Sequence, residues 1–394
     1  QYGEVLHRYT IKNALEDGSV LGFQVEHEST IHQDELANVV YRAMRSEEKN
    51  INYTDEELVS TIESMKDIDK EQYLQSTHYE SDDHIQSVIR KILSPNNAYS
   101  KFVFKDGKPT MSAILTTSSI DMAKRYYKAI KKFTADKNWL ETQFPNNPLR
   151  QGAVMNDPDF PRVAITYSLE ENTKDSALKE TEMAEIIDEY NQMFGTSWSI
   201  ESINRYNGDI NNRLARKKGE FKEFGKHLDL VIVVDRLLTG FDAPQLNALY
   251  VDRTLKGAAL IQAYSRTNRI ANIGKKDFGR IINYRWPIQN EKHMNEALGI
   301  YANRDSANVQ ESFVDGDDAD PKELVDAGIL AESFKEQLVK VQYIVNQLRD
   351  MTDHFTEVPR SEAKQEEMLN VMRLYNSGMR KLKQYDAEVL DGTL

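Results

Sequence analysis

Apolar residues along this chain fall into short continuous runs and longer helical stripes. The strands that we predict are Leu21–Val25, Met111–Leu115, Val163–Tyr167, Leu230–Val234, Leu249–Val251 and Arg280–Asn283. The run Leu230–Val234 is continuous and typical of a strand buried on both faces. Stripes of apolar residues at helical spacing lie between most of these runs. This alternation predicts a mostly parallel sheet covered by helices, so we expect an α/β fold over residues 1–285.

One region inside this predicted domain has a helical pattern only. Residues 34–94 contain stripes of apolar residues at helical spacing, among them Leu36, Val40, Ile85 and Ile89. Thr54 followed by Glu57 is a helix-start signature, because the two side chains can satisfy backbone donors of the first turn. We interpret this region as a helical insertion between the first two strands.

A second helical region follows the last strand. Residues 315–320 form an acidic linker, and two apolar stripes follow it. The first comprises Phe334, Leu338, Val341, Val345 and Leu348, and the second comprises Met368, Met372, Tyr375, Met379 and Leu382. Their spacing predicts an antiparallel helical pair, and we assign residues 286–394 to part of a helical domain.

Composition narrows the class of protein. The chain has 394 residues, of which 40% are hydrophobic, and no cysteine. It has no apolar run near the roughly 20 residues of a membrane span and no signal-peptide pattern, so we expect a cytoplasmic protein without a membrane partner. No histidine pair has metal-ligand context, and we therefore expect no metal to be bound by these residues.

The net charge of −13 argues against a protein that coats nucleic acid non-specifically, although phosphate binding depends on local patches. The candidate basic patches are Lys124/Arg125/Lys128/Lys131/Lys132, Arg213/Arg216/Lys217/Lys218 and Lys275/Lys276. Patches of this kind are more often solvated surfaces than tracks for DNA.

Candidate chemistry concentrates between positions 228 and 270. We expect one helix to carry Gln262, Arg266 and Arg269, whose spacings of four and three place them on roughly one face. Planar guanidinium groups stabilise phosphoryl transfer by spreading positive charge over phosphate oxygens. Two arginines alone usually form a solvated helix face, so the pattern needs a second signal.

That signal is the loop after the run Leu230–Val234. It contains Thr239, Gly240 and Asp242, and we expect these residues at the carboxyl end of a strand. Open α/β sheets bind ligands at that edge, so the loop and the arginines together favour a phosphate site.

Four stretches carry a resemblance to a known family. LLTGFDAP at 237–244 and LIQAYSRTNR at 260–269 resemble motifs V and VI of superfamily 2 motors. Their residues resemble the form of these motifs in the motor (R) subunit of type I restriction enzymes. MSAILTTSSIDMAKRYY at 111–127 is similar to the family's motif IV, and YTIKNALEDGSVL at 9–21 resembles the segment entering the second motor domain. The resemblance covers roughly residues 1–285 and implies a second RecA-like domain followed by a partial helical domain.

The resemblance also implies roles for individual residues. ATP with Mg²⁺ would bind between two RecA-like domains in the full-length enzyme, with Arg266 and Arg269 as arginine fingers and Gln262 orienting the nucleotide or the arginines. Gly240 and Asp242 would lie near the nucleotide.

Contacts with DNA are implied for Thr239 and for the end of the motif IV strand, at Thr116, Thr117 and Ser118. Ser118 can equally act as the N-cap of the next helix, with Asp121 at the third helical position. The implied partners are double-stranded DNA and the modification (methyltransferase) and specificity subunits of a bacterial or archaeal enzyme.

The sequence contains neither a G-x-x-x-x-G-K-[ST] phosphate loop nor an acidic D-E-x-H box. We therefore expect the first motor domain and the nuclease elsewhere in the same polypeptide, no ATP bound to this chain alone, and no hydrolysis by it. One alternative is another superfamily 2 motor, of the type III restriction or remodeller-like kind. A second is a non-catalytic helicase-like module that binds DNA or proteins, since the fold alone does not decide function.

Overall fold

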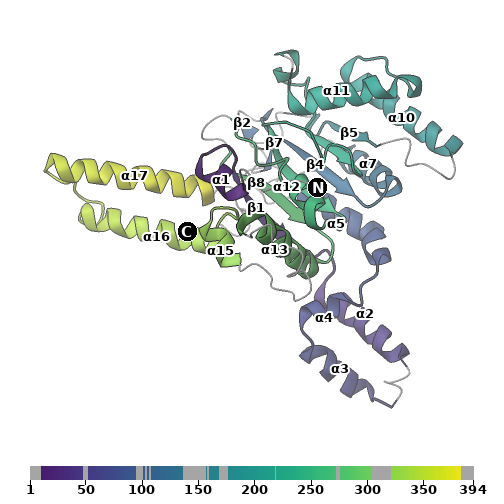
Figure 1. Cartoon of the computed structure of the whole chain (residues 1–394), viewed down its shortest axis with the longest axis horizontal. Helices are drawn as coiled ribbons and strands as arrows, with labels where there is room; N and C mark the ends of the chain where they lie inside the picture. Colours follow the sequence, from purple (N-terminus) through teal and green to yellow (C-terminus); the bar gives the residue numbers. More distant parts are fainter. Residues whose placement is uncertain are drawn as a thin grey trace, which may run out of the picture.

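A six-stranded parallel sheet organises the molecule (Figure 1). The computed structural model describes residues 10–47, 52–94, 101–102, 104–105, 108–135, 157, 159–167, 176–217, 219–271, 276–303 and 321–382. The strands are β1 (Gly22–His27), β4 (Ser112–Thr117), β5 (Val163–Thr166), β6 (Leu230–Val233), β7 (Leu246–Asp252) and β8 (Phe278–Asn283). They lie in the order β1-β8-β7-β4-β6-β5 with every pair parallel, which confirms the predicted α/β class with a RecA-like sheet.

Helices flank this sheet, because each connection between parallel strands must return to the edge at which it began. They are α1 (Ile11–Glu16), α5 (Asp82–Leu93), α7 (Ile120–Thr134), α10 (Ser176–Phe194), α11 (Ile203–Ala215), α12 (Gly257–Tyr264) and α13 (Pro287–Asn303). Short 3₁₀ turns occur at Ile200–Ser202 and Gly219–Lys222. A small antiparallel hairpin of β2 (Phe104–Lys105) and β3 (Lys108–Pro109) was not predicted from the apolar pattern.

The predicted insertion is helical and has a small core of its own. It comprises α2 (Gln33–Ser46), α3 (Asp55–Ser64), α4 (Asp67–Glu71) and a 3₁₀ helix at Ser76–Glu80, and leads into α5. Val40, Met44, Leu58 and Ile62 pack together inside it. Thr54 and Glu57 form the expected capping box of α3.

Asp252, at the carboxyl end of β7, joins the insertion to the sheet. Its buried carboxylate accepts a hydrogen bond from Nε of Arg285 at 2.7 Å and lies 2.9 Å from Nε2 of His84 in α5. Nδ1 of His84 lies 2.6 Å from Oγ1 of Thr30, and Arg285 also donates to the carbonyl of Tyr79. A buried charge needs partners of this kind, so these side chains fix the insertion against the sheet.

Glu71 provides a second attachment of the insertion. Its carboxylate accepts the backbone N–H groups of Ile288 and Gln289, at 3.0 and 3.1 Å, in the first turn of α13. Those groups have no acceptor within the helix, and a negative charge there also complements the helix dipole.

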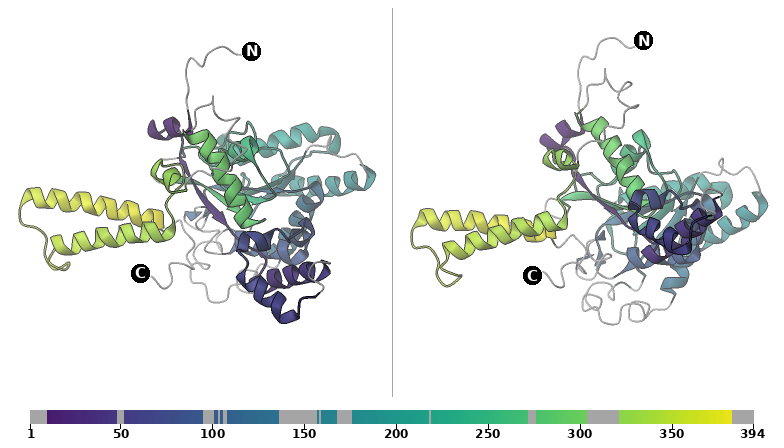
Figure 2. Two further views of the ribbon diagram at one scale, coloured as in Figure 1. Left: turned by 60° about the horizontal axis from the view of Figure 1, so that its bottom comes forward. Right: turned by 90° about the horizontal axis from the view of Figure 1, so that it is seen from below.

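The C-terminal part is helical, as predicted. α15 (Pro321–Asp326) lies near β1, and α16 (Phe334–Met351) pairs with α17 (Glu362–Leu382). Leu338, Val341 and Leu382 are the buried core of the pair. Figure 2 shows this helical pair extending away from the sheet. No helix among the described residues is long and apolar enough to cross a membrane. The predicted acidic linker at 315–320 lies outside the described residues.

Candidate functional site

The turn that carries the two arginines begins where α12 ends. The helix stops at Tyr264, so Gln262 is its only member of the predicted trio, and Arg266 and Arg269 lie in the turn that follows. The prediction of one helix carrying all three was therefore wrong. The hydroxyl of buried Thr267 donates to the carbonyl of Tyr264 at 2.9 Å, and such a local bond competes with continuation of the helix.

This turn is held at the amino-terminal edge of the sheet. A Cβ placed on Gly279 of β8 would stand only 2.3 Å from Oγ1 of Thr267, so the strand and the turn meet where only glycine fits. The carbonyl of Asn268 also accepts from the backbone N–H of Leu21, which leads into β1. The arginines therefore lie beside the beginnings of β1 and β8.

The loop between β6 and β7 crosses from one sheet edge to the other. The strands are parallel, so the loop leaves the carboxyl end of β6 at Asp235 and reaches the amino end of β7 at Leu246. Asp242 lies close to the second of these ends. The expectation that Asp242 stands at a strand's carboxyl end was therefore wrong, because the loop has already crossed the sheet by that point.

Apolar side chains anchor this loop while its polar residues stay exposed. Leu237, Leu238, Phe241 and Ala243 are buried in the main core. Thr239, Gly240 and Asp242 are exposed. Gly240 has φ +70°, a backbone conformation that favours glycine.

Both arginines contact the loop. Nε of Arg266 donates to the carbonyl of Gln262 at 2.9 Å, and Nη1 donates to the carbonyl of Phe241 at 2.6 Å. Nε of Arg269 donates to Oδ1 of Asp242 at 3.0 Å. The structure therefore brings Arg266 and Arg269 together with the loop predicted from sequence.

The electrostatics of this cluster suit an anion. The side chain of Arg269 is 35% exposed and that of Asp242 is 65% exposed. Burial lowers the pKa of Arg266, and repulsion from Arg269 adds to the effect, while Asp242 opposes it. Arginine nevertheless stays charged in proteins. Within the described residues the terminal nitrogens of Arg269 make no hydrogen bond, so they can donate to a bound phosphate.

The end of β4 differs from what was expected. Thr116 and Thr117 are fully buried, and their hydroxyls donate to the carbonyls of Val234 and Val233 respectively. Direct contact with DNA is incompatible with this arrangement. Ser118 is exposed, but the N-cap of α7 is Ser119, which accepts the N–H of Met122, so the capping role predicted for Ser118 was wrong.

The candidate basic patches are largely engaged within the protein. Lys124 and Lys128 pair with Glu182, and Arg125 pairs with Asp82. Arg213, Arg216 and Lys276 of the predicted patches are buried, and Lys218 and Lys275 lie outside the described residues. These residues do not form an exposed track.

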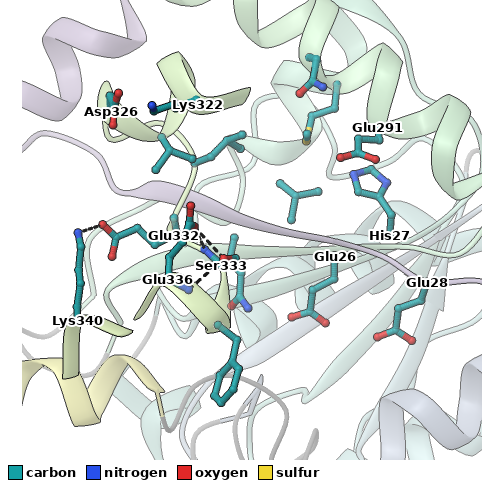
Figure 3. A pocket seen from close by; sticks show the side chains of 18 residues that line it. Glu26, His27, Glu28, Glu291, Lys322, Asp326, Glu332, Ser333, Glu336 and Lys340 are labelled. Atoms are coloured by element: carbon teal, nitrogen blue, oxygen red, sulfur yellow. Dashed lines mark hydrogen bonds and ion pairs between the residues drawn. The ribbon is translucent and has the colours of Figure 1, made fainter. Parts of the chain in front are cut away.

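A groove of about 980 Å³ lies along the outer edge of β1 (Figure 3). Glu26 and His27 of β1 and Glu28 just after it line the groove, together with residues of α13, α15 and the start of α16. It adjoins the carboxyl end of β1, whereas the arginine turn adjoins the chain just before that strand. The groove is therefore separate from the candidate site.

The sequence of this chain is similar to those of one family of known proteins. Residues 109–286 match the sequence model for domain 3 of the type I restriction enzyme subunit R. The chain is 32% identical over 289 residues to the type I restriction enzyme SsaAORF53P endonuclease subunit of Staphylococcus saprophyticus, covering 73% of this chain and 26% of the relative. It is 30% identical over 304 residues to the type I restriction enzyme SauMRSORF196P endonuclease subunit of Staphylococcus aureus strain MRSA252. This match covers 76% of this chain and 26% of the relative.

Among solved structures, the ATP-dependent type ISP restriction-modification enzyme LlaBIII bound to DNA overlaps 97% of this chain and 26% of its own, at 10% identity and a TM-score of 0.36. The sequence matches confirm the resemblance: this chain carries a domain of the type I restriction enzyme R-subunit family. It spans about a quarter of the length of these curated relatives.

Proposed function

We propose that this chain is the second motor domain of an ATP-dependent DNA translocase within a type I restriction enzyme. The family match supports the assignment to a restriction R subunit. The observation that carries the motor role is the position of Arg266 and Arg269, both bonded to residues 241–242 and both partly exposed.

The donor set fits the terminal phosphates of ATP. Arg266 and Arg269 supply planar cationic donors, and such fingers stabilise the charge that develops during phosphoryl transfer. In this proposal ATP and Mg²⁺ are held mainly by a first motor domain in the same longer polypeptide, because the present sequence has no phosphate loop. Hydrolysis of ATP supplies the free energy for movement along DNA.

The remaining residues of the set take supporting roles in this proposal. Exposed Gln262, on the last turn of α12, orients the nucleotide or the arginines, and Gly240 and Asp242 lie near the nucleotide. Thr239 and Ser118 are exposed and are the proposed contacts to the DNA backbone. Modification and specificity subunits are the proposed protein partners.

Substitution of one arginine in the complete enzyme tests the motor role. Arg266→Ala should lower ATP-dependent translocation by roughly 10³–10⁵-fold, the usual contribution of an arginine finger. Arg360→Ala removes an exposed arginine outside the site and serves as the matched control. Near-normal translocation by Arg266→Ala would exclude the finger role and favour a non-catalytic binding module.

A further inference from the structure

Lys276 is a buried cation beside the candidate site, although the sequence suggested a surface patch. It lies just before β8 and is 5% exposed. Its Nζ donates to the carbonyl of Leu246 at 2.6 Å and to the carbonyl of Pro244 at 3.1 Å. Both acceptors belong to the segment where the β6–β7 loop enters β7.

The carbonyl of Leu246 lies where the pairing of the strands is irregular. The pairing of β7 with β4 shifts register between Ser112 and Ala113, and the pairing of β7 with β8 begins only at Ala248. Leu246 is fully buried, and a buried carbonyl without a donor costs free energy. Lys276 donates to this carbonyl where the regular ladder is interrupted.

The same lysine is close to the arginine turn. Burial lowers the pKa of Lys276 to about 7, and the charge of Arg269 contributes to this effect. Pro244 stands two positions after Asp242, the residue that accepts from Arg269. Lys276 therefore contacts the chain immediately beside the ion pair of the candidate site.

We propose that Lys276 is a positioning residue that fixes Pro244 and Leu246 so that Asp242 stands opposite Arg269. The effect of Lys276 on ATP turnover rests on the proposed function. The effect of Lys276 on the position of the loop does not rest on it, and the two effects are tested separately.

The unmodified 394-residue chain provides the first test. Acetylation by acetic anhydride, followed residue by residue by mass spectrometry, should modify Lys276 at least about 10-fold more slowly than exposed Lys364, because an amine held in buried hydrogen bonds reacts only after local opening. Equal rates at the two lysines would overturn the proposal.

Hydrogen exchange of Lys276→Met provides the second test. Loss of the two hydrogen bonds donated by Nζ should accelerate exchange of the amides at 238–246 by about 10–100-fold. Lys276→Arg, which keeps a cationic donor, should restore most of the protection, and Lys364→Met is the control. Unchanged exchange in the loop, or equal acceleration in every strand, would show that Lys276 does not position this segment.

The complete enzyme provides the third test. Lys276→Met should lower kcat for ATP turnover by about 10–100-fold with little change in KM, since misplaced fingers act on the transition state. Arg269→Ala is the benchmark. Normal turnover by Lys276→Met beside an inactive Arg269→Ala would remove the catalytic consequence of Lys276. Normal turnover by Arg269→Ala would instead remove the proposed function and leave the exchange result standing.

Discussion

Nε of Arg269 donates to Oδ1 of Asp242 at 3.0 Å, although the two residues are 27 positions apart in the sequence. This pair, with the bond from Arg266 to the carbonyl of Phe241, joins the turn after α12 to the loop before β7. The two sequence motifs therefore form one surface. That surface lies at the amino-terminal edge of the sheet, where β8 begins.

The Arg269–Asp242 pair should contribute little to stability. Both side chains are substantially exposed, and exposed ion pairs contribute only about 0.2–1 kcal/mol. Asp242→Asn should therefore change the free energy of unfolding of this chain by less than about 1 kcal/mol in chemical denaturation. Asp235→Asn, which breaks the exposed pair with Arg253, is the control. A loss above about 2 kcal/mol in Asp242→Asn would mean that the loop depends on this pair for its folding.

Gly279→Ala should displace the turn that carries the arginines. The new Cβ would meet Oγ1 of Thr267 at 2.3 Å, and overpacking of this kind costs about 1–3 kcal/mol. Gly208→Ala is the matched control, because its Cβ meets nothing within 4 Å and alanine favours helix α11 by about 0.5–1 kcal/mol. Thermal unfolding of both variants measures the difference. Equal melting temperatures would contradict the close approach of β8 and the turn.

Asp252→Asn should destabilise the chain strongly. The substitution leaves the buried guanidinium of Arg285 without its carboxylate partner, a change that costs about 3–5 kcal/mol. Asp82→Asn removes an aspartate that is 90% exposed and pairs with Arg125, so it should cost less than about 1 kcal/mol. Denaturant titration of the two variants provides the comparison. Similar costs would show that the Asp252 cluster is hydrated.

His27 should make the chain less stable in acid. Burial lowers the pKa of His27 to about 4 from its ordinary value of 6.5, so between these values the unfolded chain binds a proton that the folded chain does not. The contribution to stability is complete above pH 6.5 and declines as the pH falls through about 4, by about 3 kcal/mol in total.

Unfolding measured at pH 7 and pH 4 in the wild type and in His27→Gln tests this expectation. The variant should lose less stability than the wild type between these pH values. His354→Gln, at a residue whose side chain is 76% exposed, should keep the wild-type dependence. Parallel pH profiles of the wild type and His27→Gln would show that His27 is solvated in the folded chain.

The sheet was predictable because its strands are buried on both faces. All of β6, most of β7 and the centre of β4 are apolar, so short apolar runs were a sufficient signal. The end of α12 was not predictable in the same way. Arg266 and Arg269 continue the helical spacing, and the helix ends because Thr267 bonds back to Tyr264 and packs on Gly279. Spacing along the chain contains no information about that tertiary contact.

The surroundings of charged and polar side chains were also not predictable from the sequence. Lys276 follows other polar residues and looks like part of a surface patch, yet an interrupted strand pairing gives its amine two buried acceptors. Thr116 and Thr117 look like exposed strand-end hydroxyls, yet Val233 at the end of β6 and Val234 just after it supply acceptors for both. In each case the decisive partner lies on or beside another strand, more than 25 positions away.

The cluster at Asp252 also limits how the domain can change shape. The buried carboxylate of Asp252 holds Arg285, and Arg285 also donates to the carbonyl of Tyr79 in the insertion, so swinging the insertion alone would break a hydrogen bond of a buried cation. The insertion and the sheet must consequently rotate as one body. A fluorophore attached to exposed α3 would then report the orientation of the whole domain, arginine turn included, during any working cycle.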